Sequence, residues 1–253
     1  MSVIAPRSWV FTTAVNTESS DEYLEVVKRL LIEFEALPEV ELRRKDANVG
    51  FIMYGLAMAA MRSASAAMTL YGQGFGPEAT PLVRLVYEAG VKAQWVFQNR
   101  SEGFDALLDV GGRSSVRLLS QMDKAGFSVP EDLRKDIEGF KPRSAASKRL
   151  ENFERVCTDL RGGDGLYLVY RGLSSQSHAG AQISYRYLTS DGKGGLTSAL
   201  PRTDFGVEAW TLALGLVYSG RALDEWCKNK PRKKALREAA RQLGIPPMLL
   251  LAT

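Results

Sequence analysis

The chain has 253 residues, of which 45% are hydrophobic and 25% are charged, a balance that is ordinary for a soluble globular protein and excludes an intrinsically disordered one. Its two cysteines, Cys157 and Cys227, lie 70 positions apart without a Cys-x-x-Cys motif, so a disulfide framework is not indicated. The formal net charge of +4 comes from residues 228–241, which carry seven basic residues and one acidic residue. The N-terminus lacks a basic start followed by a long apolar run, so we expect no signal peptide and a cytoplasmic location.

The first part of the chain predicts two helices after an irregular start. Residues 1–20 show no periodicity, and apolar residues at helical spacing then predict a helix that ends at Pro38. A second, long helix is predicted over residues 46–72. Its stretch 51–71 is the most membrane-like in the chain, but Arg62 at its centre and its many small residues favour a core helix, and no membrane is expected.

A third helix is predicted to begin at Pro77, because proline suits the first turn of a helix. Arg84 and Glu88 are spaced to lie on one face of this helix. The first interpretation of the two residues is an internal ion pair that fixes how the helix packs. The alternative is that one or both line a functional site.

The remaining chain continues the helical pattern. Residues 102–125 are predicted to form a helix that Gly111 and Gly112 kink or split. Further helices are predicted over residues 130–139, 144–160, 167–178 and 204–226, followed by a basic helix and tail at 228–253. Residues 180–203 predict either a small hairpin or a long loop. We therefore predict an all-α fold, with residues 1–253 in a single domain formed by a bundle of about eight helices.

The chemistry of the chain centres on its only histidine, His178, which lies seven positions after Arg171. If the segment is helical, this spacing is close to two turns and the two side chains share a face. Histidine takes or gives a proton near neutral pH, and arginine binds phosphate oxygens through its planar fork. The pair could cleave RNA without a metal: His178 would act on the ribose 2′-hydroxyl or the leaving oxygen, and Arg171 would stabilise the phosphate charge. A symmetric homodimer would bring two pairs together.

Other catalytic classes find less support in the sequence. A catalytic zinc needs three protein ligands, and one histidine with two distant cysteines does not supply them, so we expect no metal and no cofactor. Ser174 lies four residues before His178 and could hydrogen-bond it on a helix. A serine hydrolase would also need an orienting carboxylate and an oxyanion hole, which are not identifiable.

The Arg171-x6-His178 motif in an all-helical chain resembles the Arg-x4–6-His motif of the HEPN superfamily. That resemblance implies a helical bundle, often dimeric, that acts as a metal-independent ribonuclease in toxin–antitoxin and antiphage defence systems. It would make Arg171 and His178 catalytic, RNA the substrate, and a cognate antitoxin or defence protein a partner.

Residues 45–225 also resemble an uncharacterised bacterial helical family with an Arg-x-x-x-Glu helix and a later Ser-x-x-x-His segment. The matching residues are Arg84, Glu88, Ser174 and His178. This resemblance implies that the two polar pairs meet in one pocket, with Glu88 orienting His178 and Arg84 adding positive charge. Tyr170, in the same polar segment as His178, is counted as a supporting residue.

A second class of function stays open, namely a non-catalytic binding or regulatory protein whose histidine is structural. An Arg171–His178 face open to solvent would favour the ribonuclease. A closed face, with Glu88 or a serine satisfying the histidine, would favour the second class. The basic segment is either a solvated helix face or a phosphate-binding surface formed by Lys230, Arg232, Lys233, Lys234 and Arg237.

Overall fold

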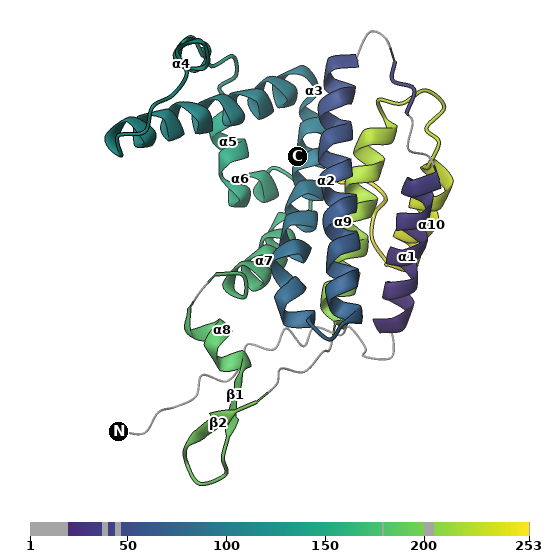
Figure 1. Ribbon diagram of the computed structural model, residues 1–253. Coiled ribbons are helices and arrows are strands. Elements are labelled where there is room, and N and C mark those ends of the chain that lie inside the picture. Colours follow the sequence, from purple (N-terminus) through teal and green to yellow (C-terminus); the bar gives the residue numbers. More distant parts are fainter. Residues whose placement is uncertain (1–19, 37–39, 44–46, 179, 200–204, 253) are drawn as a thin grey trace.

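Three helices stand side by side at the centre of the computed structural model, and the other elements surround them (Figure 1). They are α2 (Ala47–Gly72), the first part of α3 (Gly76–Lys124) and α9 (Gly206–Asp224). The structure describes residues 20–36, 40–43, 47–178, 180–199 and 205–252. Residues 1–19 of the predicted irregular start and Pro38 therefore lie outside the described residues, and Ser20 is the first residue of α1.

The other elements of the described residues are short helices and one hairpin. The helices are α1 (Ser20–Ala36), α4 (Glu131–Glu138), α5 (Ser147–Glu151), α6 (Phe153–Thr158), α7 (Gly163–Ser175), α8 (Ala181–Arg186) and α10 (Lys233–Gln242). Strand β1 (Leu188–Ser190) pairs antiparallel with β2 (Leu196–Ser198). The predicted all-α fold is confirmed, with this hairpin as the only sheet among the described residues.

Helices α3 and α9 touch at a pair of glycines. A Cβ atom on Gly90 would lie 2.5 Å from the carbonyl oxygen of Gly215, and one on Gly215 would lie 2.6 Å from the carbonyl oxygen of Val86. The absence of side chains at both positions lets the two backbones approach this closely. Sixteen of the residues of α9 are buried, so this contact lies at the centre of the apolar core.

Helix α3 bends sharply at Arg100, whose backbone angles are φ 54° and ψ −128°. Beyond this residue the second part of α3 leaves the three central helices and carries α4 at its far end (Figure 1). The prediction of a break at the two glycines is wrong, because the helix continues through Gly111 and Gly112. Gly112 instead makes room for the ring of Phe140, which occupies the place of a Cβ atom.

The helix predicted over residues 144–160 is two helices, α5 and α6. Asn152 separates them with an extended backbone, and its side-chain oxygen accepts a hydrogen bond of 3.3 Å from the backbone N–H of Arg155. Asparagine is a preferred N-cap because its oxygen satisfies a free N–H in the first helical turn. The local capping interaction therefore overrides the continuous apolar stripe that predicted one helix.

Helix α2 is long and apolar enough to cross a membrane by length and composition alone. Arg62 lies at its centre with an exposed side chain. The opposite face packs on α3 and α9 through small and flexible apolar residues, all fully buried: Met53, Ala57, Ala60, Ala64 and Ala67. One face of α2 therefore belongs to the protein core.

The segment predicted as a hairpin or a loop contains both a helix and a hairpin. Residues 181–186 are helical, although their alternating pattern was compatible with a strand. The hairpin alternative is confirmed for residues 188–198. It lies at the end of the molecule farthest from α4 (Figure 1).

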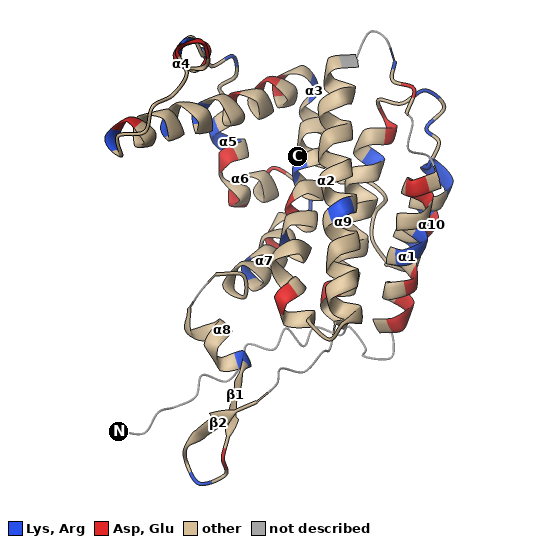
Figure 2. Cartoon of the chain, viewed as in Figure 1, with Lys and Arg blue, Asp and Glu red and all other residues tan. Residues whose placement is uncertain are grey.

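Helices α1 and α10 pack together and have opposite charge. α1 has five acidic and two basic residues, and α10 has four basic and one acidic residue. Acidic and basic residues consequently occur on neighbouring helices along this flank of the molecule (Figure 2). Between the two helices, Arg29 of α1 donates a hydrogen bond of 2.5 Å to the side chain of Gln242, and within α10 Arg241 pairs with Glu238.

Candidate functional site

Arg84 on α3 joins two residues of the α7 region into one polar cluster, which we call the Arg84 cluster: Arg84, Tyr170 and His178. Its Nη1 lies 3.0 Å from Nε2 of His178, and its Nη2 donates a hydrogen bond of 3.0 Å to the hydroxyl of Tyr170. The guanidinium carbon lies 5.1 Å from the centre of the Tyr170 ring. Residues 94 positions apart in the sequence are thus in direct contact.

The Arg84–His178 contact fixes the proton on the imidazole. Arginine has donors only, so Nε2 of His178 must accept and the ring must carry its proton on Nδ1. His178 is exposed, whereas Arg84 and Tyr170 are half-buried. Among the described residues, no acceptor lies within hydrogen-bonding reach of the buried Nε of Arg84. The cluster therefore presents an imidazole to solvent with a permanent cation directly behind it.

Buried contacts set the position of α7 and hence of the cluster. The Tyr170 ring packs against Phe153 of α6, with 4.3 Å between ring centres, and against Tyr167 at 6.1 Å. The hydroxyl of Tyr87 on α3 donates a hydrogen bond of 2.7 Å to the carbonyl of Leu166. Burial raises the pKa of the Tyr87 phenol above its ordinary value, so this donor keeps its proton. The cluster is consequently supported by the core rather than by flexible side chains.

The segment after α7 is tied to the first turns of α3. Arg186 donates to the carbonyl of Pro77 at 2.9 Å and also bonds the side chain of Gln176. The Tyr187 hydroxyl donates to the Glu78 carboxylate, and this hydrogen bond raises the pKa of Tyr187. These bonds hold His178 between two anchored points, one on each side of it in the chain.

The predicted pairing of Arg171 with His178 requires one helix that contains both residues, and α7 ends before His178. α7 ends at Ser175, and the following residues form turns and a bend, so His178 is not on the helix. The ring of His178 contacts Arg84. Arg171 is exposed and lines a separate pocket of about 520 Å³ together with Tyr167 and Gln182. The prediction that residues 167–178 form one continuous helix is wrong for its last three residues.

Two supporting residues have other roles than those predicted. Glu88 forms an ion pair of 2.7 Å with Lys92, one turn later on the same helix, so the predicted Arg84–Glu88 ion pair is wrong. Arg84 instead reaches across to α7. Ser174 is half-buried near the end of α7, and the helical spacing that would place its hydroxyl on His178 is lost when the helix ends.

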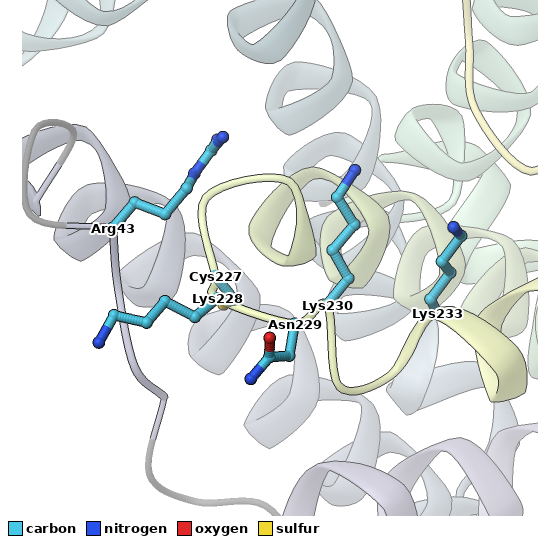
Figure 3. Close-up of a pocket in the computed structure, with 6 residues that line it drawn as sticks. All are labelled: Arg43, Cys227, Lys228, Asn229, Lys230 and Lys233. Carbon is cyan, nitrogen blue, oxygen red and sulfur yellow. The ribbon is translucent and has the colours of Figure 1, made fainter.

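The basic segment contains a second pocket, of about 470 Å³, around the loop that joins α9 to α10 (Figure 3). Arg43, Lys230 and Lys233 extend to one side of this loop, and Lys228 extends to the other. Three of these cations already bind groups of the protein. Lys230 pairs with the Glu225 carboxylate, Arg43 donates to the Glu225 carbonyl, and Lys228 pairs with Glu41 at 3.2 Å.

The remaining residues predicted to bind nucleic acid differ in solvent exposure. Arg232 is only 2% exposed; its guanidinium lies 3.4 Å from the Asp224 carboxylate and over the ring of Phe34. Arg232 therefore cannot meet phosphate, because it is part of the core. Lys234 and Arg237 are exposed on α10.

Fold and cluster together define an all-α protein that presents one exposed histidine, bonded to an arginine of a central helix. The model of a family of unknown function, DUF5677, matches residues 50–195, which is more than half of the chain and includes the whole Arg84 cluster. The chain belongs to this family. Comparison with curated proteins and with solved structures gave no match.

Proposed function

We propose that this chain is a metal-independent endoribonuclease of HEPN-like type, in which Arg84 and His178 act on the scissile phosphate. The observation that carries the proposal is the 3.0 Å contact between the Arg84 guanidinium and the exposed His178 ring. A proton-transfer group and a fixed cation are the two components that metal-free phosphodiester cleavage needs. Arg84 takes the role that the sequence motif suggested for Arg171.

The Arg84–His178 bond is the resting state of this site. A guanidinium binds phosphate oxygens through charge-assisted, bidentate hydrogen bonds that are about twice as strong as those to neutral partners. An arriving phosphodiester therefore displaces the neutral imidazole from Arg84. This exchange frees the Nε2 lone pair of His178 at the moment that substrate is bound.

Cleavage then follows without a bound metal. Nε2 takes the proton of the ribose 2′-hydroxyl, and the 2′-oxygen forms a bond to phosphorus while the bond from phosphorus to the 5′-oxygen breaks. Arg84 stabilises the negative charge that develops on the phosphate oxygens. The leaving 5′-oxygen takes a proton from solvent. The products are a 2′,3′-cyclic phosphate and a 5′-hydroxyl.

The wider role remains part of the proposal. We place the protein in the cytoplasm as a toxin or antiphage defence component, with a cognate antitoxin or defence protein as a partner. A cognate protein would keep such a nuclease inactive by covering His178, since that ring is exposed in the free chain.

Incubation of single-stranded RNA with purified protein in EDTA tests the proposal. We expect cleavage by the wild type and a loss of about 100-fold or more for His178→Ala and for Arg84→Met. The matched control is Arg117→Met, because Arg117 is 63% exposed on the second part of α3 and pairs with Glu151. No cleavage by a folded wild type, or undiminished cleavage by His178→Ala, would refute the proposal.

A non-catalytic binding or regulatory role is the second candidate function. The observation that favours it is that Arg84 already bonds both His178 and Tyr170 within the same chain. In that case the cluster serves to hold the segment after α7 on α3. The wild type would then show no nuclease activity, and His178→Ala would lower thermal stability.

A further inference from the structure

Beside the Arg84 cluster, α7 and the start of α8 form the pocket of about 520 Å³ that contains Arg171; we call it the α7–α8 pocket. Its apolar part includes the Tyr167 ring, the half-exposed side chain of Leu168 and Gly172. Its polar part includes the exposed side chains of Arg171 and Gln182. A carboxylate, Asp164, also lines it.

The α7–α8 pocket is connected to the Arg84 cluster through one aromatic contact. Tyr167 lines the pocket and stacks on Tyr170, with 6.1 Å between ring centres and 22° between ring planes. Tyr170 in turn accepts the hydrogen bond from Arg84. A ligand in the pocket would thus contact Tyr167, whose ring stacks on Tyr170 of the cluster.

We propose that the α7–α8 pocket binds the base and phosphate of a nucleotide next to the scissile one, in single-stranded RNA. This inference rests on the proposed ribonuclease function, because that function places the scissile nucleotide at Arg84 and His178 and its neighbour at the pocket. The binding itself is a property of the pocket and can be measured without cleavage.

Three features of the pocket fit this ligand. A base stacks on an aromatic ring regardless of its identity, and Tyr167 offers that ring beside the apolar surface of Leu168. Arg171 is a permanent cation placed to bind a backbone phosphate. Asp164 and Gln182 can accept hydrogen bonds from exocyclic amino groups, as base edges require.

Single-stranded RNA fits better than duplex RNA for a steric reason. In an A-form duplex the base faces are stacked on each other and are closed to a protein ring. Only an unpaired base can enter the space beside Tyr167. The inference therefore predicts a preference for unpaired substrate that Arg84 and His178 alone would not impose.

The test measures binding of a fluorescent, single-stranded 2′-fluoro RNA to the full-length protein. This RNA lacks the attacking 2′-hydroxyl and cannot be cleaved. We expect Tyr167→Leu to weaken binding by about tenfold, whereas Tyr167→Phe, which keeps the ring, binds like the wild type. Arg171→Gln should weaken binding and reduce the slope of log affinity against log salt by about 0.7, the value for one lost phosphate contact on a single strand.

Arg117→Gln serves as the control for charge, since it removes an exposed arginine on the arm formed by the second part of α3. Equal losses for Arg171→Gln and Arg117→Gln, or for Tyr167→Phe and Tyr167→Leu, would overturn the inference. So would equal affinity for a duplex of the same sequence. Thermal unfolding of each variant shows that the chain is folded.

The outcomes separate this inference from the proposed function. If the expected binding pattern is found but natural RNA is not cleaved in EDTA, the α7–α8 pocket stands and the ribonuclease proposal falls. If RNA is cleaved and the pocket variants bind like the wild type, the ribonuclease stands and the pocket is not the base-binding site.

Discussion

Helix α3 contacts its neighbours in two different ways. Toward α9 it presents Gly90, and two backbones come into direct contact because no side chain separates them. Toward α7 it presents Arg84, whose long side chain spans the gap and ends in hydrogen bonds to Tyr170 and His178. One contact excludes water and every larger side chain, whereas the other ends at the protein surface.

This difference separates what stabilises the fold from what is available for chemistry. The glycine contact tolerates no change of shape, because the atoms that would move are backbone atoms on both helices. The arginine contact depends on charge and reach, and a ligand can compete for it. We therefore expect substitutions at the first contact to change stability and those at the second to change function.

The largest effect on stability is expected for Gly90→Ala. The added Cβ would lie 2.5 Å from the carbonyl oxygen of Gly215, so α3 and α9 would have to move apart. We expect the free energy of unfolding to fall by about 1–3 kcal/mol, measured by urea denaturation. Gly55→Ala is the matched control, since nothing lies within 4 Å of its added Cβ, and it should raise stability by up to about 1 kcal/mol. Equal behaviour of the two variants would contradict the role of the glycine contact.

A smaller loss of stability is expected for substitutions of Asn152, which helps to position the helices that Arg84 contacts. Asn152 caps α6, and α6 places Phe153 against Tyr170. Asn152→Ala removes the acceptor for the Arg155 N–H and should cost about 1 kcal/mol in the same assay. Asn152→Asp keeps an acceptor and should cost less. If the two variants are equally unstable, the capping bond is not the cause.

Much of the fold could be predicted from the sequence because helical periodicity is a local signal. The boundaries of α2, α4 and α9 follow closely from apolar spacing, glycine and proline. The errors arise where a single residue decides. Asn152 divides a stripe that looked continuous. The break at Asn152 comes from a local capping bond that the apolar pattern does not reveal. The bend at Arg100, by contrast, lies close to residue 102, where the sequence predicted a new helix to begin.

The site was predictable in its members but not in its pairing. Periodicity placed Arg171 and His178 on one face of a helix, and the early end of α7 separates them. The Arg84–His178 contact was suggested only by resemblance to a family, because no sequence rule relates residues 94 positions apart. Arg186 and Tyr187, which anchor the segment to α3, gave no signal beyond a strand-like alternation.

The two buried thiols are expected to have the smallest effect on stability, because they should not change it at neutral pH. Burial raises the pKa of Cys157 to about 12 and that of Cys227 to about 11, from an ordinary value of 9.0. Both should be unreactive toward a thiol reagent at pH about 8 in the native protein and reactive in urea. The folded state keeps these protons where the unfolded state loses them, so stability should be unchanged below pH about 9 and should fall as the pH rises toward 11 and 12. Rapid labelling of the native protein would contradict the burial of both groups.

The central claim is that Arg84 holds a neutral His178 and releases it to bind phosphate. Because His178 is the only histidine in the chain, nitrogen-15 NMR of labelled protein gives one pair of imidazole signals without assignment. We predict the Nδ1–H tautomer in the free protein at pH about 8, a changed Nε2 signal in Arg84→Met, and a similar change when uncleavable RNA is added to the wild type. A ring with its proton on Nε2, or an Nε2 signal that neither Arg84→Met nor RNA alters, would contradict the account.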